Sequence, residues 1–76
     1  MTPVVMPSPK RVVRASVRVG RAMGLTHGEA LELTAFCAQS AAIDIGRKTG
    51  AHAPWLLEII AETRARQARF RLARKD

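Results

Sequence analysis

Cysteine is nearly absent from this chain, because Cys37 is the only one in 76 residues. A single thiol excludes an internal disulfide and a metal site made of cysteines alone. The sequence also has no apolar run near the ~18 residues that a transmembrane helix needs, and no signal-peptide pattern. These absences predict a cytoplasmic protein with no membrane partner.

Aromatic residues are scarce as well. The chain has three of them, Trp55, Phe36 and Phe70, and it has no tyrosine. The hydrophobic residues, 47% of the total, are therefore mostly Ala, Leu, Ile and Val. A domain of this size buries only ~60% of its chain's surface on folding. We therefore expect marginal stability, or support from a second copy in a homodimer.

Acidic residues are few, with six Asp and Glu against 13 Lys and Arg and a net charge of +7. Such an excess indicates an anionic partner. It consists mainly of arginine, whose planar guanidinium group binds phosphate oxygens in pairs. Nucleic acid is therefore the first expected partner, DNA before RNA, and an acidic protein is the alternative.

Residues suited to catalysis are also few. Cys37 falls in an apolar helical segment, which predicts a buried structural thiol rather than a nucleophile. His27 and His52 fall in turns, and their spacing with Cys37 suits no zinc site. The chain has no glycine-rich phosphate loop of the P-loop type. We expect no enzyme, no cofactor and no metal.

Proline and glycine divide the chain into a tail and three helical segments. Prolines at positions 3, 7 and 9 predict a flexible tail over residues 1–8. Residues 9–76 are expected to form one all-α domain, a compact three-helix domain with a basic C-terminal helical extension. The three helices are expected at about residues 9–23, 27–48 and 54–74.

Local sequence signals mark the ends of these helices. Ser8 is a candidate N-cap before Pro9, and Thr26 with Glu29 forms a T-x-x-E capping box. Two glycines suit the left-handed position that ends a helix, and a proline suits the start of the third helix. These residues are Gly24, Gly50 and Pro54.

The stretch KRVVRASVRVGR, residues 10–21, fits two periodicities. With the helical period, its cations gather within about 100° of the helix circumference. We place Val12, Ala15, Ser16, Val19 and Met23 opposite them, with Val13 and Gly20 at the flank. With period two, residues 12–19 form a strand whose Arg14, Ser16 and Arg18 share one face. The cap and the initiating proline favour the helix.

The strand interpretation resembles the ribbon-helix-helix DNA-binding fold. In that fold a basic N-terminal strand pairs with its mate in a dimer and enters the major groove. The resemblance implies that Arg14, Ser16 and Arg18 read bases. It is retained as the alternative architecture.

The second segment is apolar almost all round, which predicts a central, buried helix. Its alanines, and the WLLEII stripe that opens the third segment, are the candidate dimer contacts. In the third segment, Trp55, Leu56, Ile59, Ile60 and Thr63 form a stripe expected to pack on the second helix. Beyond residue 63 arginines surround the helix, so this part should project into solvent, fray or lie against a polyanion.

The stretch from LTHGEA through QSAAI to LLEIIAE resembles phage-repressor-type helix-turn-helix domains in its order of elements. The resemblance implies that Gln39 and Ser40 occupy recognition positions. However, TAFCAQ offers neither the glycine nor the polar break that the turn between the two reading helices normally carries.

Together these patterns predict a small nucleic-acid-binding protein, a DNA-binding regulator or accessory factor of the kind that phages and plasmids encode, acting through arginine–phosphate contacts. The alternative is a protein-interaction module that binds and inhibits or adapts an acidic partner, with Trp55, Leu56 and Phe70 as apolar anchors. The candidate phosphate-binding residues are Arg11, Arg14, Arg18, Arg21, Arg64, Arg66, Arg69, Arg71 and Arg74.

Overall fold

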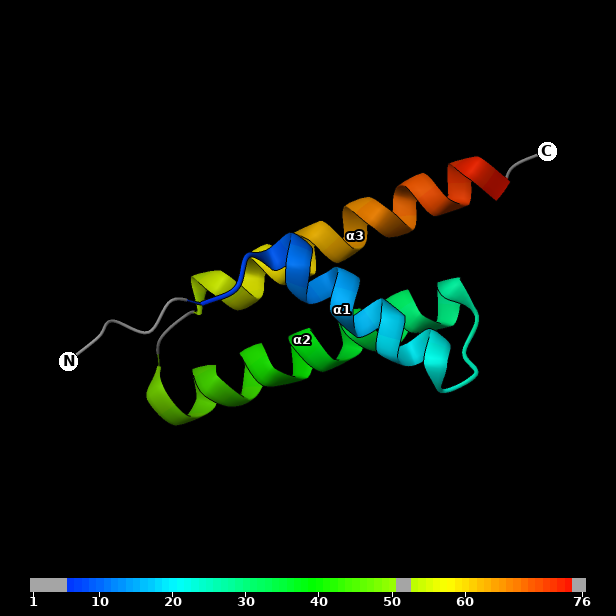
Figure 1. The fold of residues 1–76 in the computed structure, drawn as a ribbon. Coiled ribbons are helices and arrows are strands. Elements are labelled where there is room, and N and C mark those ends of the chain that lie inside the picture. The colour runs from blue at the N-terminus through cyan, green and yellow to red at the C-terminus, as the bar shows by residue number, and fades with distance from the viewer. Residues whose placement is uncertain (1–5, 51–52, 75–76) are drawn as a thin grey trace.

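The computed structural model describes residues 6–50 and 53–74, which form three α-helices. They are α1 (Pro9–Ala22), α2 (His27–Thr49) and α3 (Pro54–Arg74). α2 and α3 run antiparallel, and α1 crosses both and contacts each of them (Figure 1). The predicted all-α three-helix domain is confirmed. The ribbon-helix-helix alternative is wrong, because residues 12–19 are helical.

The helix ends use the predicted capping residues. The Ser8 side chain accepts a hydrogen bond from the Arg11 backbone N–H at 3.3 Å. At the start of α2, the Thr26 hydroxyl accepts from the Glu29 N–H at 3.1 Å, and Glu29 accepts from the Thr26 N–H at 2.8 Å. These hydrogen bonds favour the charged carboxylate and lower the pKa of Glu29. Gly50 ends α2 with a left-handed φ of 68°.

Pro7 and Ser8, at the end of the predicted tail, make specific contacts. Besides the cap made by Ser8, the Pro7 carbonyl accepts a hydrogen bond from the indole N–H of Trp55 at 2.7 Å. This bond joins the chain before α1 to the first turn of α3. Residues 1–5 lie outside the described part of the chain, so the predicted flexibility of the tail stays a prediction.

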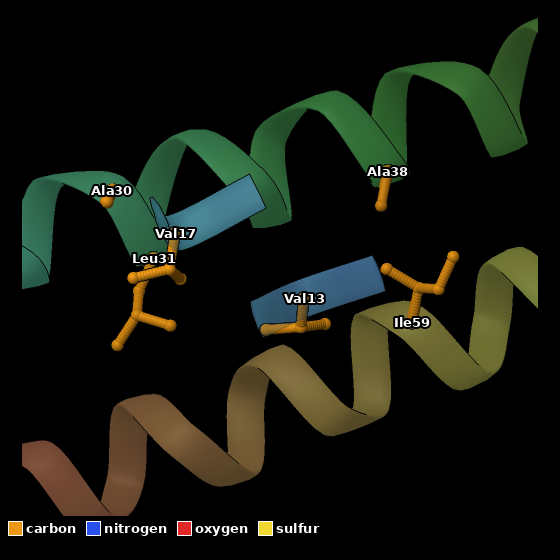
Figure 2. Packing of buried hydrophobic residues seen from close by; sticks show 6 residues of the cluster. All are labelled: Val13, Val17, Ala30, Leu31, Ala38 and Ile59. Carbon is orange, nitrogen blue, oxygen red and sulfur yellow. The ribbon is translucent and has the colours of Figure 1, made fainter. Parts of the chain in front are cut away.

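The buried core lies where the three helices meet. α1 contributes Val13 and Val17, α2 contributes Leu31 with two alanines, and α3 contributes Ile59 (Figure 2). The predicted stripe on α3 is confirmed, since Thr63 is also buried and Trp55 packs against the cluster. The core therefore consists of small aliphatic side chains from all three helices.

The core face of α1 differs from the predicted one. Val13, Val17 and Gly20 are buried, at the spacing i, i+4, i+7 of a helix that packs along one stripe. Val19 and Met23, which were placed opposite the cations, are exposed. A helical-wheel projection alone does not identify the buried face of α1, because α1 carries apolar residues over a wider arc than α2 and α3 cover.

A polar contact joins α1 to α2 next to the core. The hydroxyl oxygens of Ser16 and Thr34 lie 2.6 Å apart, and Thr34 also donates to the Ala30 carbonyl at 2.8 Å. Thr34 is buried, so the pair satisfies polar groups that would otherwise destabilise the interface.

Gly20 is the point of closest approach between α1 and α2. A Cβ atom added there would lie 2.9 Å from the Ala30 Cβ and 3.4 Å from the Ala30 Cα. These atoms belong to or adjoin the α2 backbone and cannot swing away. Only glycine therefore fits this crossing without moving a helix.

Two glycine substitutions should change stability in opposite directions. Gly20→Ala should lower the free energy of unfolding by about 1–2 kcal/mol, because the overpacked crossing outweighs alanine's better helix propensity. Gly46→Ala should raise it by about 0.5–1 kcal/mol, since alanine favours the helix and its Cβ meets nothing within 4 Å. Urea unfolding followed by circular dichroism measures both. Equal effects at the two positions would contradict the close crossing.

The prediction that α2 is central and buried all round is wrong. Leu33, Phe36 and Ile43 are exposed, and so is Cys37, which was expected to be buried. α1 and α3 cover only one side of α2, so its far side has no neighbour among the described residues. The fold is too small to enclose a helix of this length.

α2 also excludes the resemblance to helix-turn-helix domains. Residues 27–49 form one uninterrupted helix, so no turn separates two reading helices, and Gln39 and Ser40 lie in its middle. Within residues 6–50 and 53–74, none of the helices has both the length and the apolar character needed to cross a membrane.

Candidate nucleic-acid interface

The outer face of α1 carries a line of arginines. Successive spacings of three, four and three residues place these side chains on one side of the helix, away from the buried Val13 and Val17. All four are exposed, and none forms an ion pair with another described residue. We call them the α1 arginine stripe: Arg11, Arg14, Arg18 and Arg21.

Three of these arginines surround a small neutral residue. Arg11, Arg14 and Arg18 line a shallow surface depression together with Ala15. The methyl side chain of Ala15 leaves room between the guanidinium groups, which can therefore converge on one anion. This role of Ala15 was not predicted, although its position between arginines at i−4, i−1 and i+3 in the sequence was the available signal.

α1 itself contains no acidic residue to offset its charge. The first 28 residues contain five cations and no Asp or Glu. Lys10 and Arg11 lie in the first turn of α1, where the helix dipole is positive and cations cost about 0.3–1 kcal/mol each. The dipole and the side chains therefore reinforce each other in attracting an anion.

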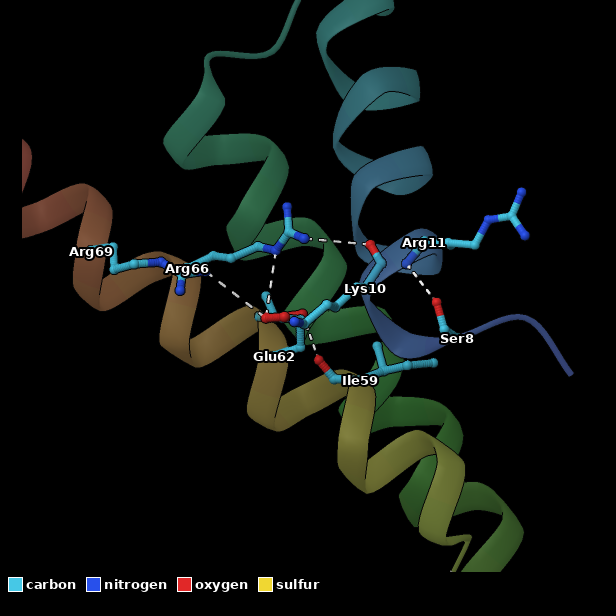
Figure 3. Close-up of polar contacts among 8 residues, drawn as sticks. Ser8, Lys10, Arg11, Ile59, Glu62, Arg66 and Arg69 are labelled. Carbon is cyan, nitrogen blue, oxygen red and sulfur yellow. Dashed lines mark hydrogen bonds and ion pairs between the residues drawn. The ribbon is translucent and has the colours of Figure 1, made fainter.

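Arg66, in contrast, acts within the molecule. Its Nη2 donates a hydrogen bond to the Lys10 carbonyl at 3.4 Å, and its Nε lies 3.7 Å from Glu62 Oε2 (Figure 3). The second distance is an ion pair, too long for a hydrogen bond. Arg66 is half-buried and joins α3 to the start of α1, so it is less available to a partner than the stripe.

Arg69 lies on the same side of α3 as Arg66. Its Nη2 lies 3.9 Å from the carboxylate of Glu62, seven residues or about two helical turns earlier (Figure 3). Its side chain is exposed, so this ion pair contributes little and can open. The role of Glu62 was not predicted, although its i,i+4 spacing to Arg66 was a signal for the ion pair.

The last arginines of α3 lie beside α2. Arg71 and Arg74 line a depression with Glu29 and Glu32 from the first turns of α2. The Arg74 guanidinium lies 5.4 Å from the centre of the Phe70 ring, within the range of a cation–π contact. The two acidic residues reduce the positive potential on this flank. Arg64, seven residues before Arg71, is exposed on the same face of α3.

Phe70 holds the end of α3 against α2. Its ring centre lies 5.0 Å from that of His27, and its edge lies 3.1 Å from where a Cβ of Gly28 would be. The basic end of α3 is therefore helical to Arg74 and packed on one side. Fraying, one of the outcomes expected for it, does not occur before Arg74, while residues 71–74 are exposed to solvent as expected.

The three predicted apolar anchors also contribute to internal packing. Trp55, Leu56 and Phe70 are each partly buried and pack against the core cluster. Any partner would meet only their remaining exposed surface.

The titratable residues do not gather into a site. Among the described residues, no group of three or more His, Cys, Asp or Glu is placed to hold a metal ion. Cys37 is exposed on α2 and His27 stacks on Phe70, while His52 lies outside the described residues.

The fold and this surface define a small three-helix domain with one arginine-lined helix. Comparison with protein-family models, with curated proteins and with solved structures gives no match. Function is therefore inferred from the chemistry of the surface alone.

Proposed function

We propose that this protein binds nucleic acid, duplex DNA in the first place, by holding the phosphate backbone on the α1 arginine stripe. The observation that supports the proposal is the stripe itself: four exposed arginines in line along one helix, with no acidic partner among the described residues. Unpaired guanidinium groups exchange the counterions of a polyanion for direct phosphate contacts, which releases those ions and favours binding.

The dimensions of the stripe suit a duplex. Arg11 and Arg21 are ten residues apart, which is about 15 Å along a helix at 1.5 Å per residue. This length corresponds to the rise of about four base pairs at 3.4 Å each. Arg14 and Arg18 lie between them, so the stripe can contact several phosphates along one strand.

The stripe supports backbone binding more than base reading. Arginine forks match phosphate oxygens regardless of sequence, and phosphate contacts carry no sequence information by themselves. The exposed face also lacks asparagine and glutamine, the residues that read adenine in the major groove. We therefore expect modest sequence preference. A role as a regulator or accessory factor then depends on where the protein is brought to DNA.

The alternative partner, an acidic protein, has weaker support. Its three predicted anchors, Trp55, Leu56 and Phe70, already pack within the monomer. An acidic protein would have to meet the arginines without them. Failure to bind any nucleic acid would make this alternative the next to test.

Fluorescence anisotropy with a random-sequence duplex and a single strand, across a salt series, tests the proposal. Four phosphate contacts should give a slope of log K against log salt of about −3 to −4 for the duplex. The single strand should show a shallower slope, because each contact releases fewer condensed ions. Absence of binding at low salt to both nucleic acids would refute the proposal, as would a slope near zero.

A further inference from the structure

The side of α2 that faces away from α1 and α3 carries large apolar side chains. Leu33, Phe36 and Ile43 are 44%, 66% and 58% exposed. No described residue covers them. Apolar side chains gathered on one exposed helix face mark an interaction surface.

These side chains recur at the spacing of a coiled-coil seam. Leu33, Phe36, Ser40 and Ile43 follow one another at intervals of three, four and three residues, and all are exposed. This alternation of three and four keeps side chains in line along a helix so that they can face a second helix. We call these four residues the α2 seam.

The two ends of the α2 seam carry opposite charges. Glu29 lies four residues before Leu33, and Arg47 lies four residues after Ile43, so both continue the same line. Both are exposed. The Glu29 carboxylate also accepts the capping-box hydrogen bond and borders the depression with Arg71, and it keeps its negative charge in both contacts. The seam therefore begins with an acid, ends with a base and is apolar in between.

We propose that the α2 seam is a self-association surface, on which α2 of a second copy packs antiparallel. The two helices cross at the level of Ala38 along the helix axis, although the Ala38 side chain itself lies on the buried face of α2. In this register Leu33 faces the partner's Ile43, and Phe36 faces the partner's Ser40. Each large side chain of the central layers meets a small one, which lets the two helices approach closely.

Charge decides the orientation of the pair. In the antiparallel register Glu29 faces the partner's Arg47 at both ends, because both residues lie nine positions from the centre. A parallel pair would place Glu29 against the partner's Glu29 and Arg47 against the partner's Arg47. Like charges in facing positions repel, so only the antiparallel pair is complementary.

This surface differs from those that the sequence suggested for a dimer. Ala30 and Ala38 of the alanine-rich helix are buried in the monomer, and Ile59 of the WLLEII stripe belongs to the same core. The α2 seam is the part of α2 that these contacts leave free. Because it offers only three large apolar side chains per copy, the interface is small, and we expect micromolar association.

The pairing also fixes where the two α1 helices lie. Cys37 flanks the seam and lines a groove with Val12 and Ser16 of α1. In an antiparallel pair the same flank of each helix meets its counterpart. Both α1 helices therefore lie on one side of the α2 pair, a consequence that holds whatever ligand α1 binds.

Analytical ultracentrifugation over a concentration series tests self-association. The wild-type chain should form a dimer at micromolar concentrations, and Phe36→Ser should weaken it by about a hundredfold, because two buried rings are lost per dimer. Leu72→Ser is the matched control, since Leu72 is an exposed leucine on α3, and it should leave the dimer intact. Circular dichroism checks that both variants keep their helices. A wild-type chain that stays monomeric at hundred-micromolar concentration would overturn the proposal.

A charge reversal tests the orientation. Arg47→Glu should weaken an antiparallel dimer by about tenfold, because it places two glutamates face to face at each end. In a parallel dimer the same change replaces one like-charge pair by another and has no such effect. Lys48→Glu is the control. Lys48 follows Arg47 in the sequence but does not lie on the α2 seam, and the substitution changes the charge by the same amount.

Cross-linking gives an independent answer. In a Cys37→Ser background, a chain with Leu33→Cys should cross-link to a chain with Ile43→Cys and not to itself. Self-cross-linking of each variant, without the mixed product, would refute the antiparallel register.

Discussion

Replacing Arg14 and Arg18 together by glutamate should weaken binding to a random-sequence duplex by about a hundredfold at low salt. Each position loses a phosphate contact and then repels the DNA backbone. The slope of log K against log salt should therefore become shallower by about two. Both side chains are exposed on α1 and make no ion pair with another described residue. The fold should therefore be unaffected, and circular dichroism can check it.

The matched control reverses Arg64 and Arg71 on α3. This double variant has the same net charge, but Arg71 lines a depression that also contains Glu29 and Glu32. If the α1 arginine stripe is the interface, the α3 variant should lose less than a third of the binding free energy that the Arg14 and Arg18 double variant loses. Equal losses in the two variants would show that net charge, and not the stripe, determines affinity. Retention of wild-type affinity by the α1 variant would contradict the stripe directly.

Leu31→Ala should be the most destabilising single substitution in the core, with a loss of about 3 kcal/mol in the free energy of unfolding. Leu31 is fully buried, at 0% exposure, and is the largest of the fully buried side chains. Alanine keeps the helix propensity, so the loss reflects the apolar burial that is removed together with the cavity left behind. A core of this size supplies only ~3–5 kcal/mol, and the variant should therefore be partly unfolded at 25 °C.

Urea and thermal unfolding followed by circular dichroism measure this loss. Leu72→Ala is the control, because Leu72 is 70% exposed and its truncation should change stability by less than about 0.5 kcal/mol. If the chain self-associates, both measurements belong at one fixed concentration, since association adds to the apparent stability. A Leu31→Ala loss below 1 kcal/mol would show that the three helices do not meet at Leu31.

The architecture was readable from the sequence because its signals are local. Ser8, the capping box of Thr26 and Glu29, and Gly50 each act within a few residues of their own position, so their effect does not depend on what packs nearby. For the same reason the arginine spacing on α1 predicted a single charged face. The helical state of residues 10–21 followed from these signals, in spite of four valines.

The tertiary structure decided which faces are covered. The helical period placed Val13 and Gly20 at the flank of α1, yet both are buried. Gly20 is buried because the crossing of α1 and α2 brings it against Ala30. The apolar residues of α2 suggested a buried helix, but Phe36 and Ile43 are exposed, since α1 and α3 are the only other helices among residues 6–50 and 53–74 and they cover one side of it.

The same reason separates the arginines into two groups. From the sequence, the nine candidate arginines were equivalent, because charge and spacing do not reveal which residues pack nearby. Packing of α3 against α1 engages Arg66 with Glu62 and the Lys10 carbonyl, and packing against α2 sets Arg71 beside two glutamates. The sequence by itself therefore determined the helices, their ends and the excess of positive charge. Only the tertiary structure decided which cations and which apolar side chains remain free, because that depends on contacts between residues distant in the chain.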